Sequence, residues 1–395
     1  RNKRMFTGLE DVDVVVTLRR EGRTLREAVL DAQVPAGETR SFPLPFDIPE
    51  APGEYTLDVA YRLKAGTDWA PADYEVGWEQ EVVWVEAAVS DDAAAMAPTA
   101  PAPRVVESTH NIGVHGRHFS VQFSRLYGHL VSYRYGRTSD GGRELLRDLP
   151  YPSFWHAPTS NERGWGMPFR DGQWLLASKT RRLRAGWEKP RVVRHDAAVE
   201  VQFGYELPTV PPSEVDVSYL VDGSGHVDVT MTVRPGEGLP DMPEFAMTLT
   251  VDADLHRLRW YGDGPAECYV DRRGGARLDV WEGDVREQLT RYMRPQESGS
   301  RTGVRWAEVL DDAGFGVRLD CPGGMELSAL PWTPLEIESA RHPNELPPIL
   351  RTVLRPALMR RGVGGDQSWG AMTHPEYRLP TGELTFTFGF QGVLR

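Results

Sequence analysis

The chain has 395 residues, of which 40% are hydrophobic, 26% charged and 10% aromatic, an ordinary globular composition sufficient for two or three domains. Its 45 basic and 57 acidic residues give a net charge of −12, which argues against nucleic acid as a partner because phosphate backbones would be repelled. No apolar stretch approaches the length of about 18 residues that a membrane span needs, so no membrane association is expected. Two cysteines, Cys268 and Cys321, cannot build a disulfide framework and are compatible with the cytoplasmic location that we expect.

Alternating hydrophobic residues predict β-strands along most of the chain. Every second position is hydrophobic over 12–18 and 55–63, the pattern of half-buried strands. The same alternation over 215–221 and 227–233, on either side of an Asp-Gly-Ser-Gly turn, predicts a hairpin. One more strand is predicted over 384–390. The fold class expected from these patterns is all-β with short helical insertions.

The clearest helix signal lies near residue 333. Thr333 supplies a capping hydroxyl, Pro334 suits the first helical position, and Glu336 completes a capping box. The pair His342-Pro343 should end this helix after about two turns, because a residue before proline disfavours helical geometry.

A change of composition predicts one domain boundary. Residues 87–103 read AAVSDDAAAMAPTAPAP, which is rich in Ala and Pro and typical of a semi-extended linker. We therefore predict an immunoglobulin-like β-sandwich over 1–87, a linker over 88–103 and a larger sheet-on-sheet domain over 104–395. The chain opens on Arg1 without an initiator Met and soon enters a strand pattern, which suggests a piece of a longer polypeptide.

Standard catalytic and metal-binding motifs are absent from the sequence. It contains no Walker loop, nucleophile elbow, paired-histidine zinc helix or calcium loop. The ten histidines lack ligand spacing, so no metal site is predicted.

Tryptophan is unusually frequent, with twelve in the chain. Trp155, Trp165, Trp174 and Trp187 fall within one span that glycines and prolines should keep irregular. Aromatic rings on irregular segments suit carbohydrate binding, because a flat ring covers the apolar face of a sugar. For any single Trp, packing in a core is the more frequent role.

Five stretches carry a family resemblance. They are FWHAPTSNERG over 154–164, similar to the pattern FWRAPTDNDRG; WYGDGPAECYVDR over 260–272, similar to WYGRGPxENYxDR; YMRPQESG over 292–299, similar to YxxPQENG; Pro331-Trp332-Thr333-Pro334 with His342-Pro343; and GGDQSW over 364–369. In this order and spacing, from about Asn2 to the C-terminus, the chain resembles the last two domains of the long β-galactosidases of glycoside hydrolase family 2.

The resemblance implies a specific architecture and a divided function. It implies an immunoglobulin-like sandwich followed by a large, galactose-mutarotase-like β-supersandwich. Family members cleave β-galactosides such as lactose by the retaining route, with two glutamates about 5 Å apart. These glutamates and the magnesium and sodium ligands belong to a (β/α)₈ barrel that the chain does not resemble. We therefore expect no catalytic residue and no cofactor on this chain, no hydrolysis by the isolated chain, and a role in a homo-oligomer beside the barrel of a parent chain or partner subunit.

One residue takes a substrate role from the resemblance. Trp369 matches the tryptophan that the family's last domain projects into the active site, where it stacks on the sugar. Glu267 and Asp271 lie in a motif that we interpret as structural. The Asn-Glu pairs at 161–162 and 344–345 resemble the family's acid/base pair only superficially, because each lies inside a supersandwich-type motif.

Four residues are candidates for the rim of the sugar pocket: His156, Asn161, Glu162 and Trp165. Here the chain departs from the family pattern, since His156 replaces Arg, Ser160 replaces the first Asp and Glu162 replaces the second. Losing a guanidinium and a carboxylate removes strong directional hydrogen bonds. Either the network has been rebuilt locally or the pocket edge has a different preference.

Two other functions stay open at this point. The chain could be the small subunit of a split β-galactosidase, or a free-standing carbohydrate-binding module. The sequence does not distinguish lactose from longer galactosides.

Overall fold

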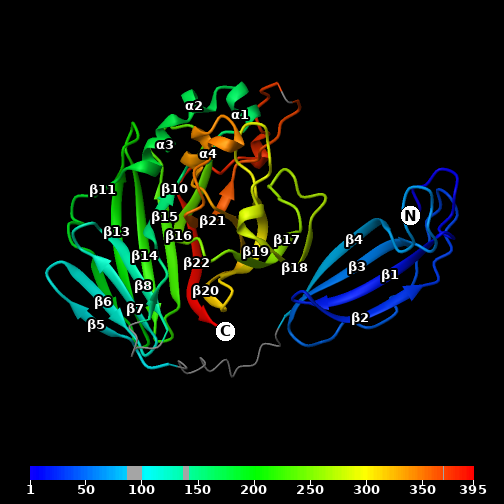
Figure 1. The fold of residues 1–395 in the computed structure, drawn as a ribbon, viewed down its shortest axis with the longest axis horizontal. Coiled ribbons are helices and arrows are strands. Elements are labelled where there is room, and N and C mark those ends of the chain that lie inside the picture. The colour runs from blue at the N-terminus through cyan, green and yellow to red at the C-terminus, as the bar shows by residue number, and fades with distance from the viewer. Residues whose placement is uncertain (87–99, 137–141, 368) are drawn as a thin grey trace. The chain divides into compact units, whose positions relative to one another are not determined.

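The computed structural model describes residues 1–86, 100–136, 142–367 and 369–395. The chain forms two compact units, which are Arg1–Ala95 with Arg277–Val280, and Met96–Ala276 with Trp281–Arg395. Most of the predicted linker 88–103 lies outside the described residues, which resume at position 100. Nearly all regular elements are strands, so the predicted all-β class is confirmed (Figure 1).

The first unit is built on an antiparallel sheet with the strand order β2-β1-β3-β4. The strands are β1 (Val12–Arg20), β2 (Arg23–Leu30), β3 (Gly53–Leu63) and β4 (Glu75–Val85). β1 and β3 contain the predicted strands 12–18 and 55–63, and they pair in register with Val14 opposite Tyr61. The two central strands of the sheet are thus the ones with the clearest hydrophobic alternation.

The second unit contains two sheets over its described residues, except that residues 277–280 of the larger sheet belong to the first unit. The smaller has the order β5-β6-β7-β8-β9, and the larger follows the path β10-β16-β21-β20-β22-β15-β14-β13-β11, with β12 and β17–β19 attached beside it. The strands of the smaller sheet are β5 (Arg104–Glu107), β6 (Asn111–His115), β7 (Phe119–Ser124), β8 (His129–Tyr135) and β9 (Arg143–Glu144). Those of the larger are β10 (Asp148–Ser153), β11 (Arg182–Leu183), β12 (Arg191–Arg194), β13 (Ala198–Leu207), β14 (Ser213–Asp222), β15 (Val227–Arg234), β16 (Glu244–Asp252), β17 (Arg257–Gly264), β18 (Arg277–Asp284), β19 (Ser300–Leu310), β20 (Phe315–Leu330), β21 (Arg351–Arg360) and β22 (Leu384–Leu394).

Aromatic contacts join the two sheets into one core. The ring of Phe123 on β7 lies 6.2 Å from that of Phe203 on β13 and 5.4 Å from that of Tyr219 on β14, measured between centroids. The predicted hairpin is confirmed as β14 and β15, along which buried and half-buried positions alternate. The predicted strand 384–390 is the first part of β22, which pairs with β15.

Helices gather at one end of the second unit (Figure 1). They are α1 (Ser160–Gly164), α2 (Met167–Arg170), α3 (Gly172–Lys179) and α4 (Pro334–Ser339). The unit also contains three short 3₁₀ helices in its described residues, η2 (Val285–Glu287), η3 (Pro343–Glu345) and η4 (Pro375–Tyr377). The capping box of Thr333 and Glu336 is confirmed at the start of α4. Across the described residues, no helix combines the length and apolar character needed to cross a membrane.

The tryptophan-rich span differs from its prediction. We expected it to be irregular, but residues 160–179 form the short helices α1, α2 and α3, whereas the segments around Trp155 and Trp187 are irregular as expected. The reason at its start is a second capping box, in which the N–H of Glu162 donates to the Thr159 hydroxyl at 3.2 Å and the N–H of Thr159 donates to the Glu162 carboxylate at 2.9 Å. This Thr-x-x-Glu signal was present in the sequence and was missed.

An ion network lies inside the core of the second unit. The guanidinium of Arg355 on β21 contacts Glu244 on β16 at 2.8 Å and Glu297 at 2.7 Å. Arg360, also on β21, contacts Glu244 at 3.2 Å. The four side chains are at most 1% exposed. Each charge depends on its partners, because an uncompensated buried charge is strongly destabilising.

Candidate functional site

A buried ion pair forms the base of the predicted rim. The Nε2 of His156 lies 2.9 Å and 3.0 Å from the two carboxylate oxygens of Glu162, the third residue of α1. Both side chains are inaccessible to solvent. They therefore cannot contact a sugar directly, and they support the rim from within.

This pair explains two departures from the family pattern. His156 stands where the family pattern has Arg and Glu162 where it has Asp, and in this chain the two side chains contact each other. The third departure, Ser160, is exposed, and its backbone N–H donates to the side chain of Gln296 at 2.7 Å. These contacts satisfy the three departing positions within this chain, and the preference of the pocket edge stays open.

Neighbouring charges favour the ionised form of both groups. Burial, the largest single influence, lowers the pKa of His156, but the carboxylates of Glu162, Glu297 and Glu244 together raise it above 6.5. Burial raises the pKa of Glu162, yet His156 and Arg361 together lower it to about 2. The stabilisation from His156 is lost as pH rises through its folded-state pKa, and that from Glu162 is lost as pH falls from about 4.5 towards 2.

Arg361 is the functional support that sequence reasoning missed. Its buried guanidinium contacts Glu162 at 3.1 Å, Asp171 at 2.8 Å and Asp241 at 3.2 Å. These carboxylates come from α1, from the residue before α3, and from the segment before β16. One cation therefore ties three segments of the rim together. A charged pair at the end of the hydrophobic strand β21, Arg360-Arg361, was the available signal.

The ring of Trp165 is not freely exposed for stacking on a sugar. Its half-buried ring has the guanidinium of Arg361 at 4.9 Å and that of Arg170 at 5.5 Å from its centroid. Two cations next to the ring leave Trp165 less open to a sugar than its sequence position indicated. Trp155 and Trp174 are buried in the core, in agreement with the more frequent role of tryptophan.

Trp369 is the exposed aromatic residue of the predicted site. Its side chain is 89% exposed, at the tip of the segment 362–373, which we name the Trp369 loop. Asn161 on α1 hydrogen-bonds to this loop, where its Nδ2 donates to the carbonyl of Ala371 at 2.7 Å and its Oδ1 accepts from the N–H of Gly370 at 3.0 Å. The structure thus brings Trp369 and Asn161 together, although they lie far apart in the sequence.

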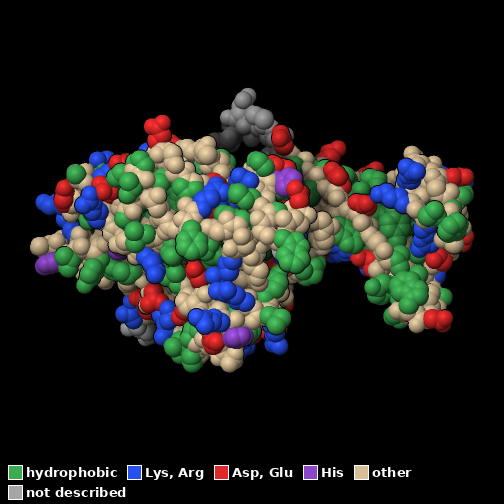
Figure 2. Space-filling model, turned by 90° about the horizontal axis from the view of Figure 1, so that it is seen from above, with side chains coloured by type: hydrophobic (Ala, Val, Ile, Leu, Met, Phe, Trp, Pro, Cys, Tyr) green, Lys and Arg blue, Asp and Glu red, His purple; other side chains and the backbone are tan. Residues whose placement is uncertain are grey.

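Other large hydrophobic side chains are exposed on the segments around α1. Phe169 on α2 is 95% exposed, and Met293, on the segment that Gln296 joins to Ser160, is 91% exposed. Figure 2 looks onto the end of the second unit that carries the helices, where hydrophobic side chains are exposed among Lys and Arg side chains. Several large apolar groups exposed on neighbouring segments are typical of a surface that another domain covers.

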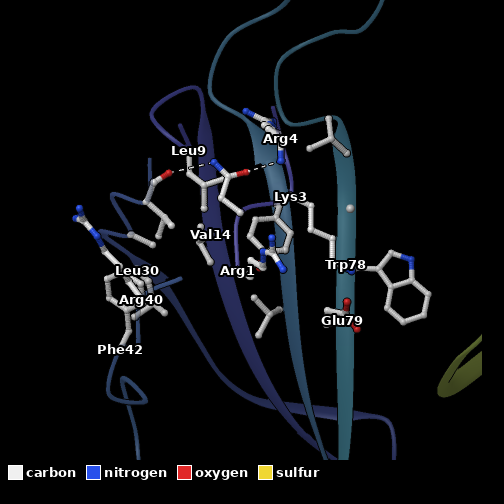
Figure 3. A pocket seen from close by; sticks show the side chains of 17 residues that line it. Arg1, Lys3, Arg4, Leu9, Val14, Leu30, Arg40, Phe42, Trp78 and Glu79 are labelled. Atoms are coloured by element: carbon white, nitrogen blue, oxygen red, sulfur yellow. Dashed lines mark hydrogen bonds between the residues drawn. The ribbon is translucent and has the colours of Figure 1, made fainter. Parts of the chain in front are cut away.

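The first unit has a hollow of its own, of about 590 Å³ (Figure 3). Aliphatic side chains of the sheet, such as Val14 and Leu30, line it together with Arg1, Lys3 and Arg4. None of the site residues predicted from the sequence belongs to it. The hollow therefore contributes nothing to the candidate sugar site.

Metal ligands do not cluster in the described parts of the chain. Within residues 1–86, 100–136, 142–367 and 369–395, no group of three or more His, Cys, Asp or Glu side chains could hold a metal ion.

Two family models match the chain. The model described as "Beta galactosidase small chain" matches residues 115–391, and the one described as "Beta-galactosidase, domain 4" matches residues 1–83. Together they cover most of the chain, and the first covers the whole of the candidate site.

Curated relatives carry matching names. A "Beta-galactosidase" of Priestia megaterium is 35% identical over 96% of this chain and 36% of its own length, and one of Halalkalibacterium halodurans is 36% identical over 100% and 38%. A "Beta-galactosidase small subunit" of Latilactobacillus sakei is 30% identical over 72% of this chain and 96% of its own length. The chain thus spans little more than a third of the longer relatives and nearly all of the small subunit.

Solved structures show a weaker likeness. A galactose 1-epimerase from Lactobacillus acidophilus aligns with 75% of this chain and 100% of its own, with 10% identity and a TM-score of 0.37. A GalM/aldose epimerase homologue from C. elegans aligns with 75% and 98%, with 11% identity and a TM-score of 0.39.

Proposed function

Because the chain belongs to the β-galactosidase family, we propose that it supplies the sheet domains of such an enzyme and completes its sugar site with Trp369. The hydrolysis of terminal β-galactosides would follow the retaining route, with both catalytic glutamates on a barrel in the parent chain or in a partner subunit. Metal ions would also be held by that barrel. The buried, unpaired thiols of Cys268 and Cys321 agree with a reducing, cytoplasmic location.

The exposure of Trp369 is the observation that carries this proposal. Leaving a large aromatic side chain in water forgoes about 1.5–3 kcal/mol of burial, and Trp369 shares such exposure with Phe169 and Met293. An indole ring can cover the C–H face of a galactose ring, and its N–H can still find a polar partner. The ring stays free because the Trp369 loop is attached to α1 through its backbone rather than through the indole.

The isolated chain is expected to release no phenol from a chromogenic β-galactoside, since it lacks the acid/base and the nucleophile. Adding a barrel-bearing fragment, from the same coding region or from a co-encoded large subunit, should produce turnover. Substantial turnover by the pure chain alone would contradict the proposal. Calorimetry with lactose or galactose separates it from a carbohydrate-binding module, because half a site should bind weakly whereas a module should bind tightly.

In the assembled enzyme, Trp369→Ala should lower kcat/KM by about 10- to 100-fold, which corresponds to roughly 1.5–3 kcal/mol of lost sugar contact. Steady-state kinetics with a chromogenic galactoside measures this effect. Trp84→Ala is the matched control, since Trp84 on β4 is also exposed, at 60%, and belongs to the first unit. Equal activities of the two variants would remove Trp369 from the sugar site.

The small-subunit arrangement has specific support of its own. The match to the Latilactobacillus sakei small subunit covers 96% of that protein, so this part of the family also occurs as a separate chain. Co-purification of the chain with a separately encoded barrel would establish the arrangement here. A barrel encoded in the same polypeptide would establish the single-chain form.

A further inference from the structure

The base of the Trp369 loop is fixed by hydrogen bonds to its backbone. Asp271 accepts from the N–H of Val363 at 3.1 Å and from that of Gly364 at 2.7 Å. The hydroxyl of Thr373 donates to the carbonyl of Gly362 at 2.7 Å and lies 3.1 Å from that of Gly364. The two ends of the loop are therefore joined before the chain reaches its tip.

The tip of the loop has a different support, which comes from α1. The carboxamide of Asn161 uses both of its ends, since Nδ2 donates to Ala371 and Oδ1 accepts from Gly370. A carboxamide offers a donor and an acceptor on one rigid plane, so it can hold a backbone segment in one orientation. Gly370 follows Trp369 directly, which places this support at the backbone of the next residue.

Two glycines allow the loop to approach α1 this closely. A Cβ atom on Gly164 would lie 2.9 Å from the Cα of Gly370, and one on Gly370 would lie 2.7 Å from the carbonyl carbon of Gly164. Such distances are shorter than any normal Cβ contact, and Gly370 also has φ of +99°, which side chains rarely adopt. The loop and α1 thus touch backbone to backbone.

From these contacts we infer that Asn161 is a positioning residue that holds Trp369 in place for the sugar, an inference that rests on the proposed function of Trp369. An exposed ring on a mobile loop would lose conformational freedom when the sugar binds, and this loss would weaken binding. Fixing the loop in advance removes much of that cost. Asn161 contacts the loop and not the ring, so it acts on the sugar only through Trp369.

The first test measures the loop without any need for activity. The full chain is labelled with 5-fluorotryptophan, and the ¹⁹F resonance of Trp369 is identified by its loss in Trp369→Phe. In Asn161→Ala we expect this resonance to move and narrow, while those of the eleven other tryptophans stay in place. Asn344→Ala is the matched control, because Asn344 is exposed on η3 and also precedes a glutamate. An unchanged Trp369 resonance in Asn161→Ala overturns the inference.

The second test uses the assembled enzyme and a double-mutant cycle. Asn161→Ala should raise KM for a chromogenic galactoside by about 3- to 10-fold with a smaller change in kcat. The reason is that a loop no longer fixed in advance must be ordered when the sugar binds. In the Trp369→Ala background the same substitution should change KM by less than about 2-fold, since its effect passes through the missing ring. Equal effects in both backgrounds would assign Asn161 a merely structural role.

The two tests fail in different ways. If Trp369→Ala leaves the activity unchanged, the proposed function is wrong, whatever the ¹⁹F spectrum shows. If Trp369→Ala lowers the activity but Asn161→Ala changes neither the resonance nor KM, the positioning role is wrong and the proposed function stands. Gly164→Ala gives an independent check, because its added methyl group should displace the same resonance while leaving the Asn161 carboxamide intact.

Discussion

Replacing Arg361 with Met is expected to lower the free energy of unfolding by about 3–5 kcal/mol near pH 7. The substitution removes the cation shared by the buried carboxylates of Glu162 and Asp171 and by the partly buried carboxylate of Asp241. Glu162 keeps His156, whereas Asp171, whose pKa burial already raises, keeps only the half-exposed Arg170 at 3.4 Å. Urea unfolding of the full chain, followed by near-ultraviolet circular dichroism of the buried tryptophans, measures the loss.

The loss of unfolding free energy in Arg361→Met should also depend on pH. Without Arg361, burial is opposed only by Arg170 and the pKa of Asp171 should rise further, so acid should neutralise this carboxylate. The deficit should therefore be smaller at pH 5 than at pH 8. Arg182→Met is the control, because the side chain of Arg182 is 76% exposed in its pair with Glu206 and should contribute less than about 1 kcal/mol. A deficit for Arg361→Met as small as that of the control would show that the rim does not depend on it.

Hydrophobic alternation predicted the sheet framework because it is a local property of each strand. The hairpin of β14 and β15 needs only the period of its side chains and one turn, and both are contiguous in the sequence. The capping box of α4 is equally local. Such features can be recognised from neighbouring residues alone, without knowledge of which strands meet.

The support of the candidate site could not be predicted in the same way, because its contacts join distant residues. Arg361 and Glu162 are 199 positions apart, and Asn161 and Ala371 are 210 apart. A charged residue in a sequence is normally assigned to the surface, and only the fold shows that Arg361 is buried. The resemblance identified Trp369, but it did not indicate what fixes the loop that carries it.

Replacing Glu326 with Gln is expected to stabilise the second unit at alkaline pH by about 3 kcal/mol. Glu326 on β20 is buried, and burial raises its pKa from 4.5 to about 7 although Arg360 opposes the shift. Between these pH values the folded chain holds a proton that the unfolded chain has released, so stability falls as pH rises through this window. Glutamine stays neutral at every pH, and its side-chain oxygen can still accept the hydrogen bond from the N–H of Arg360, which is 2.9 Å long.

The comparison across pH distinguishes this titration from a general effect of the substitution. Near pH 4.5 the native Glu326 is protonated, so Glu326→Gln and the unaltered chain should unfold at similar urea concentrations. Their curves should separate as pH rises and stay parallel above about pH 8. Glu282→Gln, at an exposed position on β18, should follow the unaltered chain throughout. If Glu326→Gln also follows it from pH 5 to 8, the carboxylate is ionised in the folded state at low pH, and Arg360 compensates fully for its burial.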